Sequence, residues 1–136
     1  YYMGRGHTNG DSVVYFPNLK TVHGGDLLHG TAPFIDYGNG GSSRGWVGTM
    51  NNILSLDWDT AIPGHGAVME RRDVLNFRNQ MEAVRERMGS LIRGGLDAAD
   101  APEAIKDSGL SWTQAEQGLF MQRSIPGFYE EIAGEL

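Results

Sequence analysis

The chain has 136 residues, of which 40% are hydrophobic and 21% are charged, and this balance predicts one folded domain with a packed core. Its formal net charge of −6 disfavours a nucleic-acid surface, which would need a basic stripe. The chain has no cysteine, so a transition-metal site must be built from His, Asp or Glu. No apolar run approaches the roughly 20 residues that span a membrane, and no signal-peptide pattern opens the sequence.

The first half of the sequence predicts short strands joined by glycine-rich turns. Residues 12–16 and 21–23 are β-branched and aromatic runs on either side of a Pro-Asn turn, which predicts a β-hairpin. We expect the second strand to stop at Gly24-Gly25, with Asp26 at its end. Residues 27–43 are rich in glycine, serine and proline and predict a long irregular loop. Residues 60–63 predict another short strand.

Helical patterns dominate the rest of the chain. Residues 43–56 place apolar side chains at spacings of three and four, which predicts a helix. A longer helix is predicted by one apolar stripe, formed by Val74, Phe77, Met81, Val84, Met88 and Leu91. Shorter helices are expected at 100–106 and 128–136, and we expect the C-terminal helices to pack on the strands. The prediction is a single α/β domain with a strand-and-loop part at 1–68 and a helical part at 69–136.

Three segments share one design, in which a metal-capable side chain lies beside glycines at the end of a predicted strand. His7 lies in Gly-His-Thr-Asn-Gly-Asp, Asp26 follows Gly-Gly, and His65 lies in Pro-Gly-His-Gly. Imidazole and carboxylate bind zinc, iron and manganese, and glycines let loops approach closely. A single histidine of this kind is more often an ordinary loop or core residue. Three matching segments in one sequence favour a metal centre.

These segments together resemble motifs of the metallo-β-lactamase superfamily. His7-Thr8-Asn9-Gly10-Asp11 is similar to its G-H-T-x-G-D motif, Gly24-Gly25-Asp26-Leu27 to its later strand-end aspartate, and Pro63-Gly64-His65-Gly66 to its last P-G-H-G motif. Order and spacing agree, as does the amphipathic helix after the last histidine. The resemblance covers about residues 1–92 and implies the C-terminal half of a four-layer αββα sandwich.

The resemblance also implies roles for these residues. His7 would bind one metal ion, His65 a second, and Asp26 would bridge them. Zinc is the expected metal, as two ions in the complete protein, with iron or manganese as alternatives. Water activated by the metal ions would attack a small-molecule ester, thioester, lactone, amide or lactam carbonyl, or a phosphodiester. Thr8 and Asp11 would support the histidine loop without binding metal, and a simple turn-stabilising role for Asp11 is an equally good interpretation.

The main signature of the superfamily, H-x-H-x-D-H, is absent from the sequence. The histidines are at positions 7, 23, 29 and 65, and no pair has His-x-His spacing. We therefore expect this polypeptide alone not to be a competent hydrolase, and to be a fragment of a longer protein or to be completed by a second chain. Half of a sheet sandwich leaves an apolar face and strand edges uncovered, so we expect a homodimer.

Two other functions remain open at this stage. The chain is either the hydrolase described above or a non-catalytic domain that self-associates and binds metal weakly or not at all. A small-molecule-binding module that uses the loop at 27–43 is a third interpretation. Neither nucleic acid nor membrane is expected as a partner. Of the remaining histidines, His23 is interpreted as an ordinary strand residue. His29 is close enough in sequence to reach the site, although an ordinary loop role is favoured.

Overall fold

The computed structural model describes residues 1–30 and 32–136; residue 31, within the expected loop, lies outside the described residues. The strands are β1 (Val14–Phe16), β2 (Thr21–His29), β3 (Thr60–His65) and β4 (Met69–Glu70). The α-helices are α1 (Ser43–Leu54), α2 (Arg71–Arg93), α3 (Ala101–Ala104), α4 (Ser111–Gln114) and α5 (Ile125–Glu135). Short 3-10 turns at Pro17–Leu19, Tyr37–Asn39, Ala98–Asp100 and Ile105–Ser108, and a π-helical segment at Phe120–Ser124, join them. No helix in the described ranges has the length and hydropathy needed to cross a membrane.

The strands form one mixed sheet in the order β1-β2-β3-β4. β1 and β2 are the predicted hairpin, in which Val14 pairs with His23 and Phe16 with Thr21. β2 and β3 run parallel, and β4 returns antiparallel beside β3. Parallel strands need a crossover connection, and here the crossover contains α1. The architecture is therefore α/β, as predicted from the sequence.

The prediction that the second strand stops at Gly24-Gly25 is wrong. β2 continues to His29, so Asp26 lies within the strand and not beyond its end. The continuation requires a bulge: the register with β3 shifts on both sides of Gly25, whose φ is +52°. Glycine adopts this left-handed conformation without steric cost. The Gly-Gly pair therefore bends the strand and re-aims the residues that follow it.

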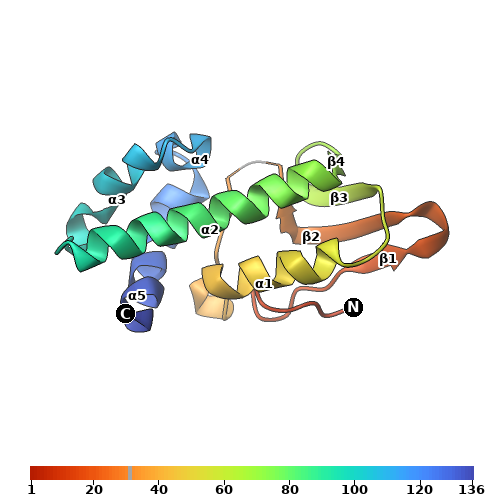
Figure 1. Ribbon diagram of the computed structural model, residues 1–136, viewed down its shortest axis with the longest axis horizontal. Helices are drawn as coiled ribbons and strands as arrows, with labels where there is room; N and C mark the ends of the chain where they lie inside the picture. The colour runs from red at the N-terminus through yellow and green to blue at the C-terminus, as the bar shows by residue number, and fades with distance from the viewer. Residues whose placement is uncertain (31) are drawn as a thin grey trace.

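Helices α1 and α2 lie side by side over one face of the sheet (Figure 1). The predicted stripe on α2 is confirmed, because all its members except Leu91 are buried. The stripe meets Trp46, Met50 and Ile53 of α1 and the inner side chains of the sheet in one hydrophobic core. Removal of this apolar surface from water is the main driving force for docking the helices on the strands.

The prediction that the C-terminal helices pack on the strands is wrong. Helix α2 has 23 residues and extends past the sheet, and the later helices pack around its second half (Figure 1). Aromatic rings fill the space between them. The ring centroids of Trp112 and Phe120 are 4.6 Å apart, and those of Phe120 and Phe128 are 5.4 Å apart, both edge to face. These rings extend the one hydrophobic core of the molecule from the sheet, along α2, to the C-terminal helices.

Arg71, at the start of α2, holds the end of α1. Its guanidinium donates hydrogen bonds to the carbonyl oxygens of Leu56 (3.0 Å), Trp58 (3.1 Å) and Leu54. It also lies over the ring of Trp58, 4.7 Å from the centroid. The last carbonyl groups of a helix have no partner within the helix. Arg71 satisfies the carbonyl group of Leu54, the last residue of α1, and also holds the segment that follows it, so it fixes α1 relative to α2.

We predict that Arg71→Ala lowers the free energy of unfolding by about 2–3 kcal/mol, because three carbonyl groups lose a charged donor and Trp58 loses its cation contact. Urea denaturation measures this change. The neighbouring Arg72 is exposed and pairs only with the exposed Glu70, so Arg72→Ala is the matched control and changes the same quantity by less than about 0.5 kcal/mol. Equal effects of the two substitutions would contradict the role of Arg71.

Candidate functional site

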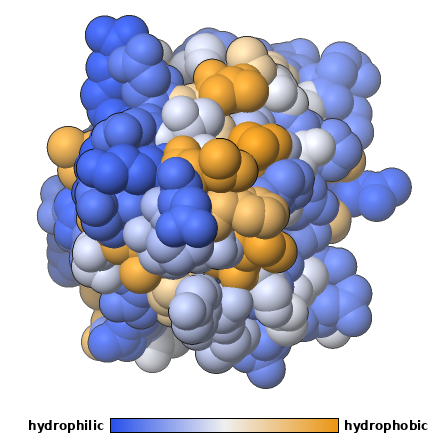
Figure 2. All heavy atoms as spheres, turned by 90° about the vertical axis from the view of Figure 1, so that its right-hand side faces the viewer, coloured by the Kyte–Doolittle hydropathy of each residue, from blue (hydrophilic) through white to orange (hydrophobic). Residues whose placement is uncertain are grey.

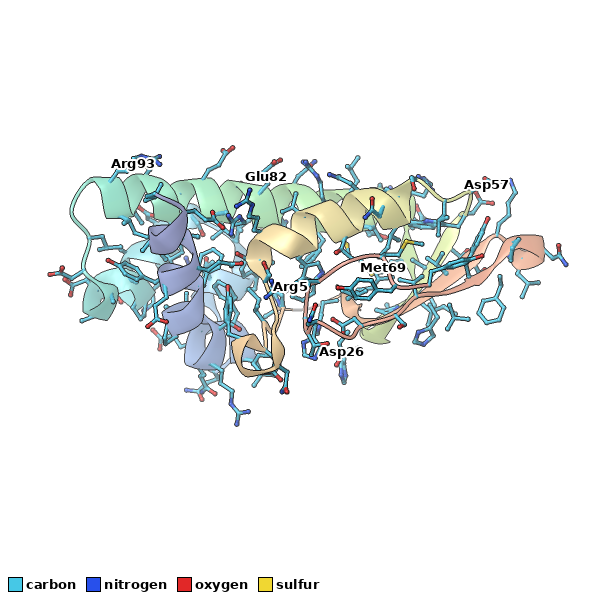
Figure 3. The ribbon with its side chains drawn as sticks, turned by 90° about the horizontal axis from the view of Figure 1, so that it is seen from below. Arg5, Asp26, Asp57, Met69, Glu82 and Arg93 are labelled. Atoms are coloured by element: carbon cyan, nitrogen blue, oxygen red, sulfur yellow. The ribbon has the colours of Figure 1, made fainter. Side chains whose placement is uncertain are left out.

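The three side chains singled out by the sequence motifs lie together in the structure. Asp26 is between two histidines: its Oδ2 lies 3.4 Å from Nε2 of His7, and its Oδ1 lies 3.3 Å from Nε2 of His65. Each imidazole therefore faces a different oxygen of one carboxylate. Figure 3 shows Asp26 near the end of the sheet that faces the C-terminal helices, whereas Asp57 marks the opposite end.

The orientation of His7 is set by the backbone of the loop before α1. Its Nδ1 lies 2.7 Å from the carbonyl oxygen of Phe34. A carbonyl oxygen only accepts hydrogen bonds, so Nδ1 must carry the hydrogen. In a neutral imidazole Nε2 is then the unprotonated nitrogen. Metal-binding histidines are commonly held in this way, with the second ring nitrogen donating to a carbonyl group.

The cluster formed by His7, Asp26 and His65 needs a positive charge between its nitrogen and oxygen atoms. A nitrogen lone pair of His7 facing a carboxylate oxygen of Asp26 is repulsive unless a proton or a cation lies between them. The His7 side chain is 15% exposed, that of Asp26 is 37% exposed and that of His65 is 69% exposed. The cluster is thus open to solvent on the His65 side, where an ion can enter.

The described part of the chain contains no group of three or more His, Cys, Asp or Glu side chains arranged to hold a single metal ion. This result is compatible with the contacts of Asp26, because His7 and His65 approach opposite oxygens rather than one common point. The donor set fits two separate positions, each with one imidazole nitrogen and one carboxylate oxygen. It does not form a closed site for one ion.

The approach of β3 to the bulge of β2 depends on glycine. A Cβ atom on Gly64 would lie 2.4 Å from Oδ1 of Asp26 and 2.8 Å from the carbonyl carbon of Gly25, so a side chain there would collide. Gly66 has a φ of +107°, and a Cβ on it would lie 3.0 Å from the Cα of Gly30. The glycines around His65 therefore allow its ring to reach Asp26.

Thr8 and Asp11 act within the His7 loop. The backbone N–H of Thr8 donates to Oδ2 of Asp11 at 2.6 Å, and the hydroxyl of Thr8 accepts from the N–H of Gly10 at 3.1 Å. The carbonyl oxygen of His7 accepts from the N–H of Asp36 at 2.9 Å. These contacts close the turn that follows His7 and hold its backbone.

Comparisons with known proteins agree with this geometry. No protein-family model matches the chain. The alpha subunit of 2,4-dinitroanisole O-demethylase from Nocardioides sp. (strain JS1661) is 31% identical over 96 residues, which cover 71% of this chain and 29% of that protein. The type 2 metallo-β-lactamase of Bacillus cereus is 32% identical over 75 residues, covering 52% of this chain and 29% of that enzyme. The chain thus spans less than a third of the length of these relatives.

Solved structures support the same relationship. DIM-1 metallo-β-lactamase superposes with a TM-score of 0.53 at 26% identity, over 60% of this chain and 40% of that one. TMB-1 superposes with a TM-score of 0.52 at 25% identity, over 60% of this chain and 39% of that one. Over the matched part, the chain resembles metallo-β-lactamases in both sequence and fold. The share of the solved chains that it covers fits the C-terminal half predicted from the order of the motifs.

In this metallo-β-lactamase-like chain, the sequence favoured an ordinary loop role for His29. The structure instead places its ring beside those of His7 and His65. Its ring centroid is 6.4 Å from that of His7 and 6.0 Å from that of His65, with the His29 and His65 planes only 23° apart. His29 is 8% exposed, and neither ring nitrogen has a hydrogen-bond partner among the described residues. Burial lowers the pKa of His29 from 6.5, although the charge of Asp26 acts in the opposite direction. In a regular strand, residues three apart point to opposite faces. The strand pattern therefore does not predict that the side chain of His29 lies beside that of Asp26.

The segment that orients His7 is itself anchored by the C-terminal part of the chain. The N–H of Ile35, next to Phe34, donates to Oγ of Ser124 at 2.9 Å. Ile35 and Ser124 are both buried. The peptide unit whose carbonyl group sets the tautomer of His7 is therefore held by Ser124, which lies 89 positions beyond Ile35.

Glu131 of α5 makes a second anchor at the N-terminus of α1. Its carboxylate accepts hydrogen bonds from Tyr37 (2.8 Å), from Ser42 (2.5 Å) and from the backbone of Ser43 (3.0 Å), and Arg85 lies 3.5 Å away. Burial acts to raise the pKa of Glu131, but the hydrogen bonds from both serines and the tyrosine outweigh it, and its pKa lies below 4.5. The carboxylate is ionised at neutral pH and joins the loop, α1, α2 and α5.

We predict that Glu131→Gln lowers the free energy of unfolding at pH 7 by about 1.5–3 kcal/mol, because charge-assisted hydrogen bonds are lost beside Arg85. A carboxyl group whose pKa is lowered on folding stabilises the fold above its unfolded pKa. This stability is lost as the pH falls below 4.5, through the folded pKa. The variant should therefore lose less stability than the wild type between pH 7 and pH 3.

Urea denaturation at several pH values measures both effects. Glu130 is the matched control, since it is the adjacent residue on α5 and is exposed. Glu130→Gln should leave the stability and its pH dependence close to those of the wild type. An unchanged acid sensitivity in Glu131→Gln would show that this carboxylate does not stabilise the anchor.

Proposed function

We propose that this chain supplies His7, Asp26 and His65 to the metal centre of a metal-dependent hydrolase. The observation that supports it best is the Asp26 carboxylate, which faces Nε2 of His7 on one side and Nε2 of His65 on the other. Bound metal ions would supply the activation of water for attack on a carbonyl group. We propose zinc, which imidazole and carboxylate suit, and the same donors would accept iron or manganese.

The surrounding residues orient the proposed ligands His7 and His65. The carbonyl group of Phe34 presents Nε2 of His7 towards Asp26, and Gly64 lets His65 approach from β3. Thr8 and Asp11 keep the His7 turn closed. The proposed substrate is a small molecule with an ester, thioester, lactone or lactam group. By their names the two curated relatives act differently, one in O-demethylation of 2,4-dinitroanisole and one as a β-lactamase, so the fold alone does not choose between substrates.

We further propose that the centre needs ligands from outside these 136 residues. His7 and His65 contribute one nitrogen each and share Asp26, whereas a catalytic zinc ion usually has three protein ligands. The chain alone should therefore bind metal weakly and turn over substrate slowly or not at all. The complete catalytic unit would contain this chain together with a segment or chain that donates the remaining ligands.

Zinc binding by the 136-residue chain tests the ligand assignment. Equilibrium dialysis with metal analysis should show that Asp26→Ala and His7→Ala weaken zinc binding by at least about tenfold, since even outer-shell partners of metal ligands have effects of this size. His23 is the control, because it is exposed on β2 and contacts only the backbone N–H of Gly25 by hydrogen bond. His23→Ala should bind zinc like the wild type. If Asp26→Ala bound zinc with the affinity of the wild type, Asp26 would not be a zinc ligand.

Hydrolysis of a chromogenic ester and a chromogenic β-lactam, with and without a chelator, tests the activity. Chelator-sensitive turnover that Asp26→Ala abolishes supports the hydrolase and contradicts a non-catalytic domain. Zinc binding without turnover supports a centre that needs further ligands. If the chain neither binds zinc nor turns over either substrate, the hydrolase proposal is wrong and the non-catalytic function stands.

The uncovered face of the sheet favours a second candidate, a non-catalytic domain that self-associates. Helices α1 and α2 cover one face, and no helix of the described residues lies on the other (Figure 3). Val14 and Phe16 on β1 are 53% and 44% exposed, and Leu19 at the hairpin turn is 71% exposed. Figure 2 shows hydrophobic side chains gathered in one patch at this end of the molecule. We propose that two copies form a homodimer through this face.

We predict that the double substitution Val14→Lys and Phe16→Lys shifts the chain from dimer to monomer, because burying two ammonium groups opposes association. Sedimentation velocity measures the change. Leu75 is the control, since it is exposed on α2, away from the sheet face, and Leu75→Lys should leave the dimer intact. A wild-type chain that is monomeric at every accessible concentration would rule out the homodimer.

A further inference from the structure

The hydroxyl of Ser124 makes contacts that its own helix does not require. Ser124 ends the π-helical segment Phe120–Ser124 and directly precedes α5, where a serine commonly caps a helix by accepting from its first backbone N–H groups. Its side chain makes no such bond to α5. The hydroxyl instead accepts from the backbone N–H of Ile35 at 2.9 Å and donates to the carbonyl oxygen of Ile35 at 3.4 Å. It therefore serves the loop before α1.

The N–H of Ile35 and the carbonyl group of Phe34 belong to one peptide unit. A trans peptide is planar, so these two groups point in opposite directions and move together. Ser124 holds the N–H side, and the carbonyl side accepts from Nδ1–H of His7 at 2.7 Å. Hydrogen bonds in a chain polarise one another, so the bond to Ser124 also makes the carbonyl group a better acceptor. The hydroxyl and the imidazole are thus joined through a single rigid unit.

The same loop segment holds His7 at two further points. The ring of Phe34 meets the imidazole edge to face at a centroid distance of 5.4 Å, and the carbonyl oxygen of His7 accepts from the N–H of Asp36 at 2.9 Å. The segment therefore fixes both the ring and the backbone of His7. Ser124 and Ile35 are both buried, so water has little access to replace the hydroxyl if it is removed.

We propose that Ser124 is a positioning residue for His7, acting through the peptide between Phe34 and Ile35 to aim Nε2 at Asp26. This assignment rests on the proposed metal centre only for calling His7 a ligand, because the hydrogen bonds themselves require no metal. Without the hydroxyl, the N–H of Ile35 is buried with no acceptor, which is unfavourable. The peptide then turns towards another acceptor and withdraws its carbonyl group from Nδ1 of His7.

Hydrogen exchange followed by NMR in the metal-free chain tests this role. The proton on Nδ1 of His7 exchanges slowly with water while the carbonyl group of Phe34 holds it. We expect Ser124→Ala to accelerate this exchange by at least about fivefold, the size expected for the loss of one hydrogen bond. Zinc binding should weaken by about three- to tenfold, because direct partners of metal ligands have effects of tenfold or more and Ser124 acts one step further away.

Thr113→Val is the matched control. Thr113 is buried among the C-terminal helices, and its hydroxyl donates to the carbonyl oxygen of Leu110 within its own turn, at 2.7 Å. The substitution also removes a buried hydroxyl from this part of the chain, but it should leave the exchange of the His7 ring proton unchanged. Equal acceleration in both variants would show a general loosening and overturn the proposal, as would no acceleration in Ser124→Ala.

The wild-type chain gives a second measurement that does not depend on the folding of a variant. The N–H of Ile35 and the Nδ1 proton of His7 should both be protected from exchange. Urea below the unfolding transition should raise both rates in equal proportion, because one peptide unit carries both hydrogen bonds. A freely exchanging His7 ring proton beside a protected Ile35 N–H would overturn the proposal.

The positioning role and the metal centre fail separately. If Ser124→Ala releases the ring proton of His7 but zinc binding does not depend on His7, the positioning role stands and the metal centre is wrong. If His7→Ala weakens zinc binding but Ser124→Ala changes neither the ring proton nor zinc binding, the metal centre stands and the positioning role is wrong.

Discussion

The carboxylate of Asp26 lies between two imidazole nitrogens because β3 passes very close to a bulge in β2. That approach needs a residue without a side chain at Gly64, since a Cβ there would meet both Asp26 and the backbone of Gly25. It also needs Gly25 in a left-handed conformation. Asp26 then faces His7 and His65 at 3.4 and 3.3 Å. An imidazole lone pair that faces a carboxylate oxygen requires a proton or a cation between them, and this constraint is the physical basis of the proposed metal centre.

The C-terminal helices are part of the same arrangement, although they pack mainly on α2 and on one another. Ser124 holds the backbone beside Phe34, whose carbonyl group sets the tautomer of His7. Glu131 ties the following turn to α1. The helical part therefore orients one proposed ligand.

The proposed activities use different surfaces of one small domain. The cluster around Asp26 is open to solvent beside His65, and the uncovered face of β1 is at the hairpin end. The superfamily relationship covers only part of each relative's length. The ligand count argues that the cluster is completed by other residues, and the exposed apolar side chains argue that the sheet is covered by another surface. Both arguments support the proposal that the chain works in an assembly larger than one copy of itself.

The sequence by itself determined the resemblance to the superfamily, the hairpin, the apolar stripe of α2 and the three residues that meet at the cluster, because each depends on local spacing or on a short motif. It did not reveal that β2 continues through Gly24-Gly25, since a glycine pair is equally compatible with a strand end and with a bulge. The position of His29 and the packing of the C-terminal helices were also decided only by the tertiary structure. Both depend on contacts between residues far apart in the chain: β3 with the bulge, and α5 with the loop before α1. Such contacts are selected by the packing of the whole core, which no local pattern encodes.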